Sequence, residues 1–410
     1  MALIDGFLSR IVTRGVLTLI GHDGQSRSFG TPDADFGTVT VRFTDAGAAN
    51  YVVRHPRLGA AEAYMDGRLV VEQGDILDLI TLIRKNAPWE KAGALRIRNP
   101  LRRALSRVSG KASGLNFQSR SKQNVAHHYD LGNDFYRLFL DEDMQYSCAY
   151  FTDPANSLEQ AQVDKKAHIA AKLNLTPGQR VLDIGCGWGG MALFLHRTCG
   201  VDVLGVTLSE EQLKIARERA SAAGVSDHVK FELIDYRNAE GPFDRIVSVG
   251  MFEHVGQAHF REFFAKCRNL LSEDGVMLIH TIGRFGGPGT TDAFTRKYIF
   301  PGGYIPALSE TLAASEKSRL IAADVETLRL HYAMTIHHWY KRTLEHRDAI
   351  VAMYDERFLR MWLFYLAGAI STFESGGMGN YQILYTRKRD AIPLTRDWIT
   401  REEKGIAARA

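Results

Sequence analysis

The stretch VLDIGCGWGG at residues 181–190 decides the fold of this chain. Val181, Leu182 and Ile184 predict a short buried strand, and a glycine-rich turn joins it to a helix that begins MALFLHRT. Glycine permits unusual backbone dihedral angles and lets a ligand approach the main chain closely. The start of a helix adds unpaired N–H groups and a partial positive charge. The turn is therefore a candidate site for the carboxylate or hydroxyls of a nucleotide-like cofactor.

The spacing of the glycines narrows the choice of cofactor. Gly185, Gly187 and Gly189 follow the pattern G-x-G-x-G rather than G-x-G-x-x-G, and Asp183 precedes the first of them. An acid in that place would repel a pyrophosphate but suits the amino group of S-adenosylmethionine. A glycine pattern alone is weak evidence, and the alternative is an ordinary strand-to-helix turn. We predict an S-adenosylmethionine site.

Residues 158–283 have the α/β alternation of a doubly wound, Rossmann-like sheet. Ligands of such sheets bind at the carboxyl ends of the strands. Residues 284–410 are expected to form a long tail of helices. Strands are expected at 180–184, 202–207, 229–234, 243–249 and 276–281, with helices between them, including 210–223 and 260–271. The strand ends would then bring together Gly185, Thr207, Asp235, Gly250 and His280.

Polar residues follow each expected strand, and most of them allow two interpretations. Ser209 and Gln212 have the spacing of a helix capping box, although Gln212 could also face a ribose. The pair of Glu253 and His254 is either a surface cap or part of the functional rim, and its place at a strand end favours function. His280 ends a buried strand, where a histidine is otherwise most often a satisfied core residue.

The length of 410 residues and the globular composition, 45% hydrophobic and 24% charged, allow two or three domains. We predict a small α+β domain at 1–85 with a strand at 38–43 and helices at 55–66 and 74–84, whose role is lipid binding or oligomerisation. A basic linker would follow at 86–122 and a catalytic domain at 123–400. The four cysteines lack metal-like spacing and suit a reducing cytosol, so no metal is expected. No signal peptide or membrane span is apparent, and 361–373 is too short to be one.

Positive charge is concentrated in one segment of a chain whose net charge is only +4. Residues 81–126 hold eleven Lys or Arg and a single acid, Glu90. Leucine, isoleucine and valine alternate with the arginines, as in a helix that lies on an anionic bilayer, although Pro100 would interrupt it. A solvated linker is an equal alternative. Nucleic acid ranks last because no recognisable nucleic-acid motif accompanies the charge.

Seven stretches in a fixed order carry a resemblance to a known family. They are QNVAHHYDLGNDFYRLFLDEDMQYSCAYF, VLDIGCGWGG, GVTLSEEQ, GMFEHVG, LIHTIG, IFPGGYIP and LHYAMTIHHWY. Together they resemble the cyclopropane-fatty-acid synthase family, which includes the mycolic acid cyclopropane synthases. The similarity runs from about residue 122 to 385 and more loosely into the N-terminal region.

The resemblance implies transfer of the methyl group of S-adenosylmethionine to a cis double bond of an unsaturated phospholipid acyl chain. The alkene is the nucleophile, and loss of a proton from the new methyl group closes a cyclopropane ring. The site must therefore exclude water and supply a base. The resemblance implies that this base is a bound bicarbonate, held by Cys148, Glu253, His280, Tyr332 and the carbonyl of Ile282.

Cofactor contacts are implied in the same way, and two departures from the family pattern stand out. Tyr236–Arg237 replaces the Trp–Glu pair that the family often has, and Ala369 replaces a cysteine that some members carry. Tyrosine can still stack on adenine, whereas the charge change at Arg237 puts its contact in doubt. The expected cofactor residues are Tyr146, Ser147, Asp183, Gly185, Gly187, Gly189, Thr207, Leu208, Gln212, Asp235 and Tyr236.

Three functions are thus open. The first is a cyclopropane synthase that works from the cytoplasm on the inner face of the membrane, with a homodimer possible. The second is a related fatty-acyl C-methyltransferase that makes a methyl-branched or unsaturated product without closing a ring. The third is a lipid-surface binding protein without catalysis, which the retention of Glu253, Gly185 and Gly187 disfavours.

Overall fold

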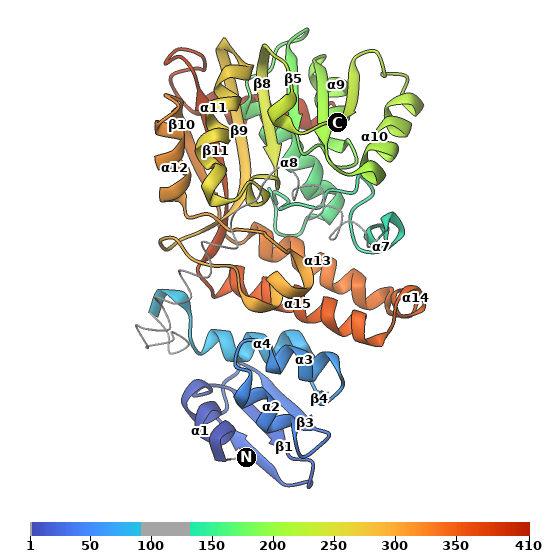
Figure 1. Cartoon of the computed structure of the whole chain (residues 1–410), viewed down its shortest axis with the longest axis vertical. Coiled ribbons are helices and arrows are strands. Elements are labelled where there is room, and N and C mark those ends of the chain that lie inside the picture. Colours follow the sequence, from blue (N-terminus) through green and yellow to red (C-terminus); the bar gives the residue numbers. More distant parts are fainter. Residues whose placement is uncertain (1, 92–131) are drawn as a thin grey trace. The chain divides into compact units, whose positions relative to one another are not determined.

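The computed structural model describes residues 2–91 and 132–410, which fall into two compact units (Figure 1). The first unit contains residues 2–91, 291–301 and 336–378. The second unit contains residues 132–290, 302–335 and 379–410.

The second unit is built on a seven-stranded sheet in the order β10-β11-β9-β8-β5-β6-β7. β5 to β9 pair in parallel, and β10 pairs antiparallel with β11. β5 has β6 on one side and β8 on the other, so the strand order reverses there, as at the ligand-binding edge of doubly wound folds. The strands are β5 (Arg180–Ile184), β6 (Asp202–Thr207), β7 (Val229–Leu233), β8 (Phe243–Val249), β9 (Leu271–Arg284), β10 (Ile321–Leu328) and β11 (Met378–Thr386).

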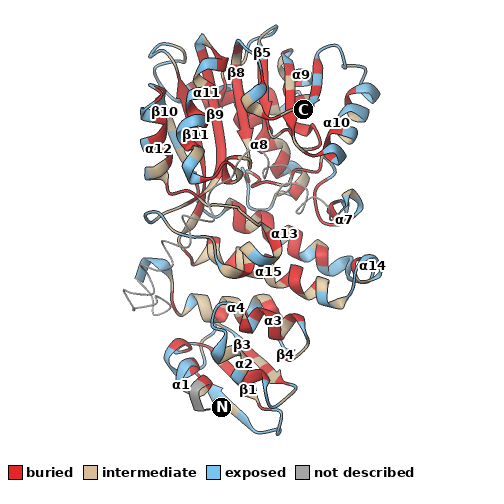
Figure 2. Ribbon diagram, viewed as in Figure 1, coloured by how far each residue is buried: buried red, intermediate tan, exposed pale blue. Residues whose placement is uncertain are grey.

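Two apolar cores form because side chains alternate between the faces of the sheet. Val181 lies in one core with α8, α9, α10 and α16, whereas Leu182 lies in the other with α11 and α12. The central strands are buried on both faces (Figure 2). The helices of this unit are α7 (Asn133–Arg137), α8 (Leu158–Lys172), α9 (Gly190–Cys199), α10 (Glu210–Ala222), α11 (Phe260–Leu270), α12 (Leu308–Glu316) and α16 (Asp397–Ala407). Short 3₁₀ turns are η2 (Tyr236–Asn238), η3 (Phe252–His254) and η4 (Gln257–His259).

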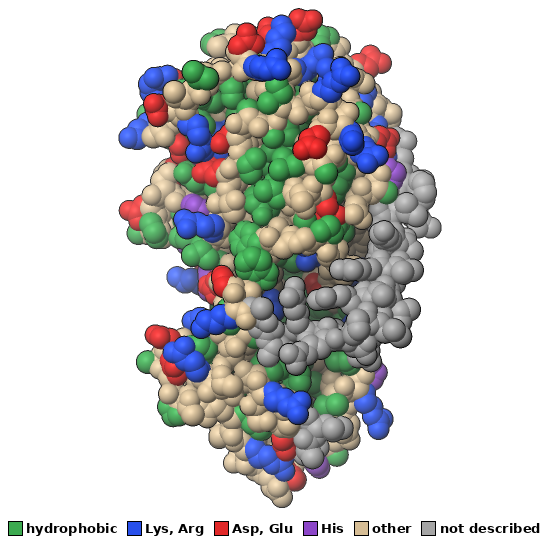
Figure 3. Space-filling view, turned by 90° about the vertical axis from the view of Figure 1, so that its left-hand side faces the viewer, with side chains coloured by type: hydrophobic (Ala, Val, Ile, Leu, Met, Phe, Trp, Pro, Cys, Tyr) green, Lys and Arg blue, Asp and Glu red, His purple; other side chains and the backbone are tan. Residues whose placement is uncertain are grey.

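The expected α/β class and the five expected strands are confirmed, but the helical tail at 284–410 is wrong. That region contributes β10 and β11 to the sheet. β11 is buried along almost its whole length. β10 is largely exposed because it is the edge strand, and its Ile321 and Val325 are exposed. Figure 3 faces this side of the molecule and shows hydrophobic side chains gathered among charged ones.

The first unit contains a four-stranded sheet in the order β2-β1-β3-β4, in which β1 and β3 are parallel. The strand expected at 38–43 is confirmed as β3, whereas the helix expected at 55–66 is shorter, as α3. The strands are β1 (Val16–Ile20), β2 (Ser26–Phe29), β3 (Thr38–Phe43) and β4 (Leu69–Gln73). The helices of residues 2–91 are α1 (Ala2–Ile11), α2 (Ala48–Arg54), α3 (Gly59–Met65), α4 (Ile76–Lys85) and the 3₁₀ turn η1 (Trp89–Lys91).

Helices from late in the chain complete the first unit. Asp75 caps the start of α4 and also accepts a hydrogen bond from the hydroxyl of Tyr340, at 2.9 Å. The backbone N–H of Trp89 donates to the carbonyl of Ser375 at 2.9 Å. These late elements are the π-turn η5 (Thr295–Ile299), the part of α13 (His331–Glu345) that follows residue 335, α14 (Arg347–Met353) and α15 (Glu356–Glu374). Across the described ranges, no helix combines the length and apolar character needed to span a bilayer.

Candidate active site

The glycine turn after β5 packs closely against neighbouring side chains at two of its glycines and is open at the third. Gly185, Gly187 and Gly189 all have positive φ angles, which only glycine adopts without strain. A Cβ atom on Gly185 would lie 2.8 Å from the Cβ of Met251, and one on Gly189 would lie 2.6 Å from the Cζ of Phe231. By contrast, no described atom lies within 4 Å of the Cβ position of Gly187. The turn therefore presents open backbone to a ligand at Gly187.

Asp183, the acid before the turn, is fully buried in β5. Its Oδ2 atom has no hydrogen-bond partner among the residues that the structure describes. Burial raises the pKa of Asp183 to about 7, and the charge of Lys165 opposes this shift. A buried carboxyl group with a free oxygen is costly unless a partner binds. It is therefore suited to an ammonium group such as that of an amino-acid-like cofactor.

The loop after β6 is held by its own polar side chains. Ser209 accepts a hydrogen bond from the N–H of Gln212, so it caps α10 as expected. The hydroxyl of Thr207 donates to the side-chain oxygen of Gln212 at 3.2 Å, while Leu208 between them is half-buried. Gln212 still has its amide nitrogen for a ribose, so both interpretations of this residue remain possible.

Just after β7, the carboxylate of Asp235 is bound by the side chain of the neighbouring Arg237. The guanidinium group binds both carboxylate oxygens, at 2.8 and 2.6 Å. Burial alone would raise the pKa of Asp235, but the hydrogen bonds from Arg237 outweigh it and lower the pKa. Tyr236 packs edge-on against Phe263, with ring centroids 5.3 Å apart. The departure at Arg237 thus has a structural role, because it neutralises Asp235.

The segment that carries Tyr146, Ser147 and Cys148 belongs to no strand or helix and is held from behind by α8. The side-chain amide of Gln162 donates to the carbonyls of Gln145 and Ser147, at 3.2 and 3.1 Å. The ammonium group of Lys165 donates to Gln145 Oε1 at 2.7 Å and to Ser147 Oγ at 2.9 Å. The ring of Tyr146 packs against those of Tyr136 and Phe139. These contacts fix the segment beside the strand ends.

Cys148 is completely buried, and burial raises the pKa of its thiol, so it is a neutral S–H group. The first turn of α13 lies next to it. Thr335 Oγ1 accepts the N–H of Ala149 at 3.0 Å, and His331 Nδ1 accepts the N–H of Phe151 at 3.0 Å. Tyr332 is largely buried in the same turn of α13. The structure thereby places Tyr332 on the helix that packs along the Cys148 segment.

Glu253, which follows β8, contacts the carboxyl-terminal part of β9 that carries His280 and Ile282. Glu253 Oε1 accepts the N–H of Ile282 at 2.7 Å. Burial raises the pKa of Glu253 to about 7 and lowers the pKa of His280 well below its usual value. The carbonyl of Ile282 accepts the hydroxyl of Thr281 at 3.1 Å. A carboxyl group with a pKa of about 7 thus contacts the backbone of β9 two residues from a neutral imidazole.

Each of these two groups keeps an atom available for a ligand. In the described part of the chain, neither Glu253 Oε2 nor His280 Nε2 has a hydrogen-bond partner. The amide of Gln382 donates to His280 Nδ1 at 3.2 Å, which leaves the ring proton on Nε2. The pair therefore offers an acceptor and a donor. A bicarbonate ion, with an O–H group and acceptor oxygens, fits this donor set.

The structure also links the two halves of the predicted set. A Cβ atom on Gly250 would lie 3.9 Å from the Cβ of Ser147, the residue before Cys148. Gly250 in turn donates its N–H to the carbonyl of His280 at 2.9 Å. The segment that carries Cys148 thus lies beside the end of β8 and beside His280 of β9.

Two supporting residues, Gln162 and Lys165, are not predictable from the sequence. They lie three positions apart, so they share one face of α8. The surrounding sequence LEQAQVDKKAHIAAK has no marked apolar face, so it gives no sign that polar groups are buried. Lys165 has no exposed surface.

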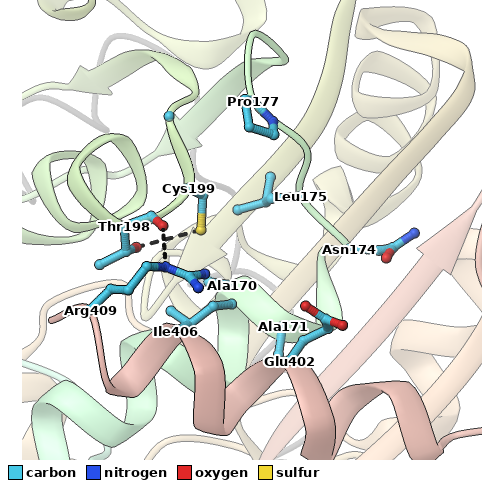
Figure 4. Close-up of a pocket in the computed structure, with 11 residues that line it drawn as sticks. Ala170, Ala171, Asn174, Leu175, Pro177, Thr198, Cys199, Glu402, Ile406 and Arg409 are labelled. Atoms are coloured by element: carbon cyan, nitrogen blue, oxygen red, sulfur yellow. Dashed lines mark hydrogen bonds between the residues drawn. The ribbon is translucent and has the colours of Figure 1, made fainter.

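A cavity of about 490 Å³ lies at the amino ends of the strands, opposite the candidate active site (Figure 4). Its lining includes Pro177 and Gly200, which come just before β5 and β6, and Ile406 of α16. Arg409 donates to the carbonyl of Thr198 at 3.0 Å beside it. Because these residues precede the strands, the cavity is separate from the site at the strand ends.

The sheet order, the glycine turn after β5 and the free carboxyl of Asp183 define the class of S-adenosylmethionine-dependent methyltransferases. The family model described as "Mycolic acid cyclopropane synthetase" matches residues 117–383. This chain therefore belongs to the mycolic acid cyclopropane synthetase family.

Relatives agree with this assignment. A probable fatty acid methyltransferase of Pseudomonas putida is 44% identical over 285 residues, which cover 67% of this chain and 72% of the relative. The cyclopropane-fatty-acyl-phospholipid synthase of Escherichia coli K12 is 38% identical over 338 residues, which cover 82% of this chain and 85% of the relative. The crystal structure of mycolic acid cyclopropane synthase CmaA1 complexed with SAH and CTAB is similar with a TM-score of 0.63 and 32% identity, covering 66% of this chain and 99% of that one.

Proposed function

We propose that this protein is a cyclopropane-fatty-acyl-phospholipid synthase. It transfers the methyl group of S-adenosylmethionine to a cis double bond of an unsaturated phospholipid acyl chain, and a bicarbonate-assisted deprotonation closes the ring. The observation that carries the proposal is the pair of buried atoms without partners, Glu253 Oε2 and His280 Nε2, at the strand ends. The E. coli relative that bears this enzyme's name supports the same activity.

Each part of the site has a task in this reaction. Asp183 binds the amino group of the cofactor, and Thr207, Leu208, Gln212, Asp235 and Tyr236 surround its nucleoside, together with the glycine turn. Glu253, His280, Tyr332, Cys148 and the Ile282 carbonyl hold bicarbonate, which supplies the base. Burial of Cys148 and His280 keeps water from the carbocation, which water would convert to an alcohol.

The substrate is proposed to be reached from an anionic bilayer surface on the cytoplasmic face of the membrane. The basic segment expected at 86–122 lies almost entirely outside the described residues, so its helix is untested; the proposal rests on its charge. Co-sedimentation with anionic vesicles should fall as salt rises, because screening weakens surface charge interactions. We propose that residues 1–85 act in lipid binding or in pairing with a second copy.

The second candidate function is a fatty-acyl C-methyltransferase that does not close a ring. The P. putida relative, named a probable fatty acid methyltransferase, favours it. Both reactions begin with the same methyl transfer and differ in how the cation loses its charge. Purified protein is incubated with S-adenosylmethionine, bicarbonate and vesicles of cis-unsaturated phospholipid. Mass spectrometry then detects an added methylene group, and proton NMR separates a cyclopropane ring from a branched or unsaturated product.

Glu253→Gln tests the assignment of the base site. We expect turnover to fall by about 100-fold or more, since general-base assistance typically contributes that much. Cofactor affinity should change less than about twofold, because Glu253 is not among the proposed cofactor residues. Glu262→Gln is the matched control, since Glu262 is a half-exposed acid on the neighbouring α11. Wild-type turnover in Glu253→Gln would contradict the proposed base site.

A further inference from the structure

The proposed bicarbonate site presents a charge problem. An anion must bind beside Glu253, a buried carboxyl group that becomes negative above about pH 7. Cys148 and His280 are neutral and add no positive charge. Placing an anion in such a pocket is unfavourable unless a cation lies close by.

Lys165 is a buried residue near the proposed bicarbonate site, and its ammonium group forms no ion pair with any residue that the structure describes. Both of its hydrogen-bond acceptors, Gln145 Oε1 and Ser147 Oγ, are uncharged. Within the described ranges, no carboxylate lies within ion-pair distance of its ammonium group. The other two lysines of α8 differ, because Lys166 pairs with Asp143 and Lys172 pairs with Glu326. Lys165 therefore differs from these two lysines, because Asp141 and Asp143 act on its charge only from beyond ion-pair distance.

Hydrogen bonds and packing connect this charge to the site. Ser147, which accepts from Lys165 at 2.9 Å, directly precedes Cys148 and lies against Gly250. Gly250 donates to the carbonyl of His280 at 2.9 Å. The ammonium group acts electrostatically on three residues of the site. Its charge opposes the rise that burial causes in the pKa of Cys148 and Asp183, and it adds to the fall in the pKa of His280.

We propose that Lys165 supplies the countercharge that allows the proposed site at Glu253 and His280 to hold bicarbonate, acting across Ser147 without touching the lipid. This inference rests on the proposed function and names a positioning residue for it. Lys165 takes no part in proton transfer, and its charge only lowers the free energy of the bound anion.

The proposal implies a pH dependence with a definite sign. Burial lowers the pKa of Lys165 to about 7, with Asp141 and Asp143 opposing this shift and Lys166 adding to it. Loss of the proton from Lys165 above this pH removes the countercharge, so bicarbonate affinity falls as pH rises. Ionisation of Glu253 weakens bicarbonate binding in the same direction. The contribution of Lys165 to the pH dependence of bicarbonate affinity is therefore the part that disappears when its side chain is replaced by one that is always charged or always neutral.

Bicarbonate binding is measured directly, without turnover. Isothermal titration calorimetry follows bicarbonate binding to the full chain saturated with S-adenosylhomocysteine between pH 6.5 and 8.5. Each dissociation constant is calculated from the concentration of the bicarbonate ion at that pH. Lys165→Met should weaken binding roughly tenfold to a hundredfold at pH 7, as a unit charge at such range would. Lys165→Arg should bind as the wild type does at pH 7 and lose less affinity at higher pH, because arginine stays charged.

Control variants and kinetics separate charge from structure. Lys166→Met, the neighbouring buried lysine, should leave the bicarbonate dissociation constant within about twofold of the wild type, because Asp143 already balances its charge. In the vesicle assay, Lys165→Met should raise the KM for bicarbonate and recover kcat at high bicarbonate, whereas a misplaced segment would lower kcat at any concentration.

Two results would overturn the proposal. One is a folded Lys165→Met protein with wild-type bicarbonate affinity. The other, which applies even if Lys165→Met does not fold, is a Lys165→Arg protein whose affinity falls with pH as steeply as in the wild type. A protein that binds bicarbonate in the Lys165-dependent manner but adds no carbon to the vesicles would instead refute the proposed function and leave the anion site intact.

Discussion

The attachment of the C-terminal helix α16 depends on a buried charge cluster, which Glu326→Gln should disrupt. His168 of α8 lies between two carboxylates, with Nε2 2.7 Å from Glu326 Oε2 and Nδ1 3.1 Å from Glu403 Oε2 on α16. Glu326 also pairs with the buried Lys172. The carboxylate of Glu326 thus binds both His168 and Lys172.

The magnitude follows from what each partner keeps after the change. Breaking a buried pair costs about 3–5 kcal/mol when a charge is left alone. Here His168 keeps Glu403, and Lys172 keeps Asp324 at 3.7 Å. We therefore expect a loss of about 2–3 kcal/mol in the unfolding free energy of the second unit. For a unit of this size that corresponds to a fall in Tm of roughly 5–10 °C.

The effect should depend on pH. Burial raises the pKa of Glu326, but hydrogen bonds from His168 and Lys172 outweigh it and hold the pKa well below its usual value. This contribution is present above about pH 4.3 and is lost as pH falls toward the folded-state pKa. Burial lowers the pKa of His168, but its two carboxylates outweigh this and raise the pKa. That contribution is complete below about pH 6.5 and is lost as pH rises through the raised value.

The assay is thermal unfolding of both proteins at several pH values. The difference in Tm should be largest between about pH 5 and 6.5 and should narrow above that range. Glu402→Gln on α16 is the control, because Glu402 pairs with the exposed Arg401 at 3.4 Å, a contact worth little. A Tm within about 1 °C of the wild type at pH 6, or a difference that grows toward alkaline pH, would refute the reasoning.

Two further substitutions test packing in each unit. Gly190→Ala would place a Cβ atom 2.3 Å from Gln145 Nε2, so it should destabilise the second unit by about 1–3 kcal/mol and weaken cofactor binding in calorimetry, whereas Gly368→Ala, a helical glycine with open space in the part of the chain that the structure describes, should be neutral or slightly stabilising. Glu62→Gln should lower the denaturation midpoint of the first unit, because burial raises the pKa of Glu62 but hydrogen bonds from Lys297, Tyr51 and Tyr298 bring it down to about 2. That difference should shrink as pH falls from about 4.5 toward 2, and a constant difference across this range would contradict the role of the charge.

The sequence predicts the parallel half of the sheet well because its strands are apolar and are punctuated by glycine turns. β5, β6 and β8 begin and end where their patterns indicate. β10 was not predictable, because an exposed edge strand rich in acids lacks the alternation that marks a half-buried strand. β11 was missed because a fully buried run resembles a buried helix segment when helices surround it.

In the candidate site, too, some residues could be placed from the sequence and others could not. Placing His280 beside the residues that follow β8 requires only the rule that parallel strands end at one edge, and the register of Val249 with His280 agrees with it. The part played by Lys165 and Gln162 could not be foreseen, because it depends on which face of α8 the irregular segment at 145–147 crosses. Long-range packing of an irregular segment leaves no periodic signal in the sequence.

The state of the carboxyl groups distinguishes the site from the rest of the second unit. Asp235 and Glu326 each bind a cation of this chain, and their pKa values fall despite burial. Asp183 and Glu253 are both buried, each retains an oxygen without a partner among the described residues, and their pKa values rise to about 7. A fold selected for stability alone would pair or replace such groups, since each costs free energy. Their presence near the carboxyl ends of the strands, with the buried Lys165 nearby, is accounted for if the missing partners are ligands: a cation for Asp183 and a proton-bearing anion for Glu253.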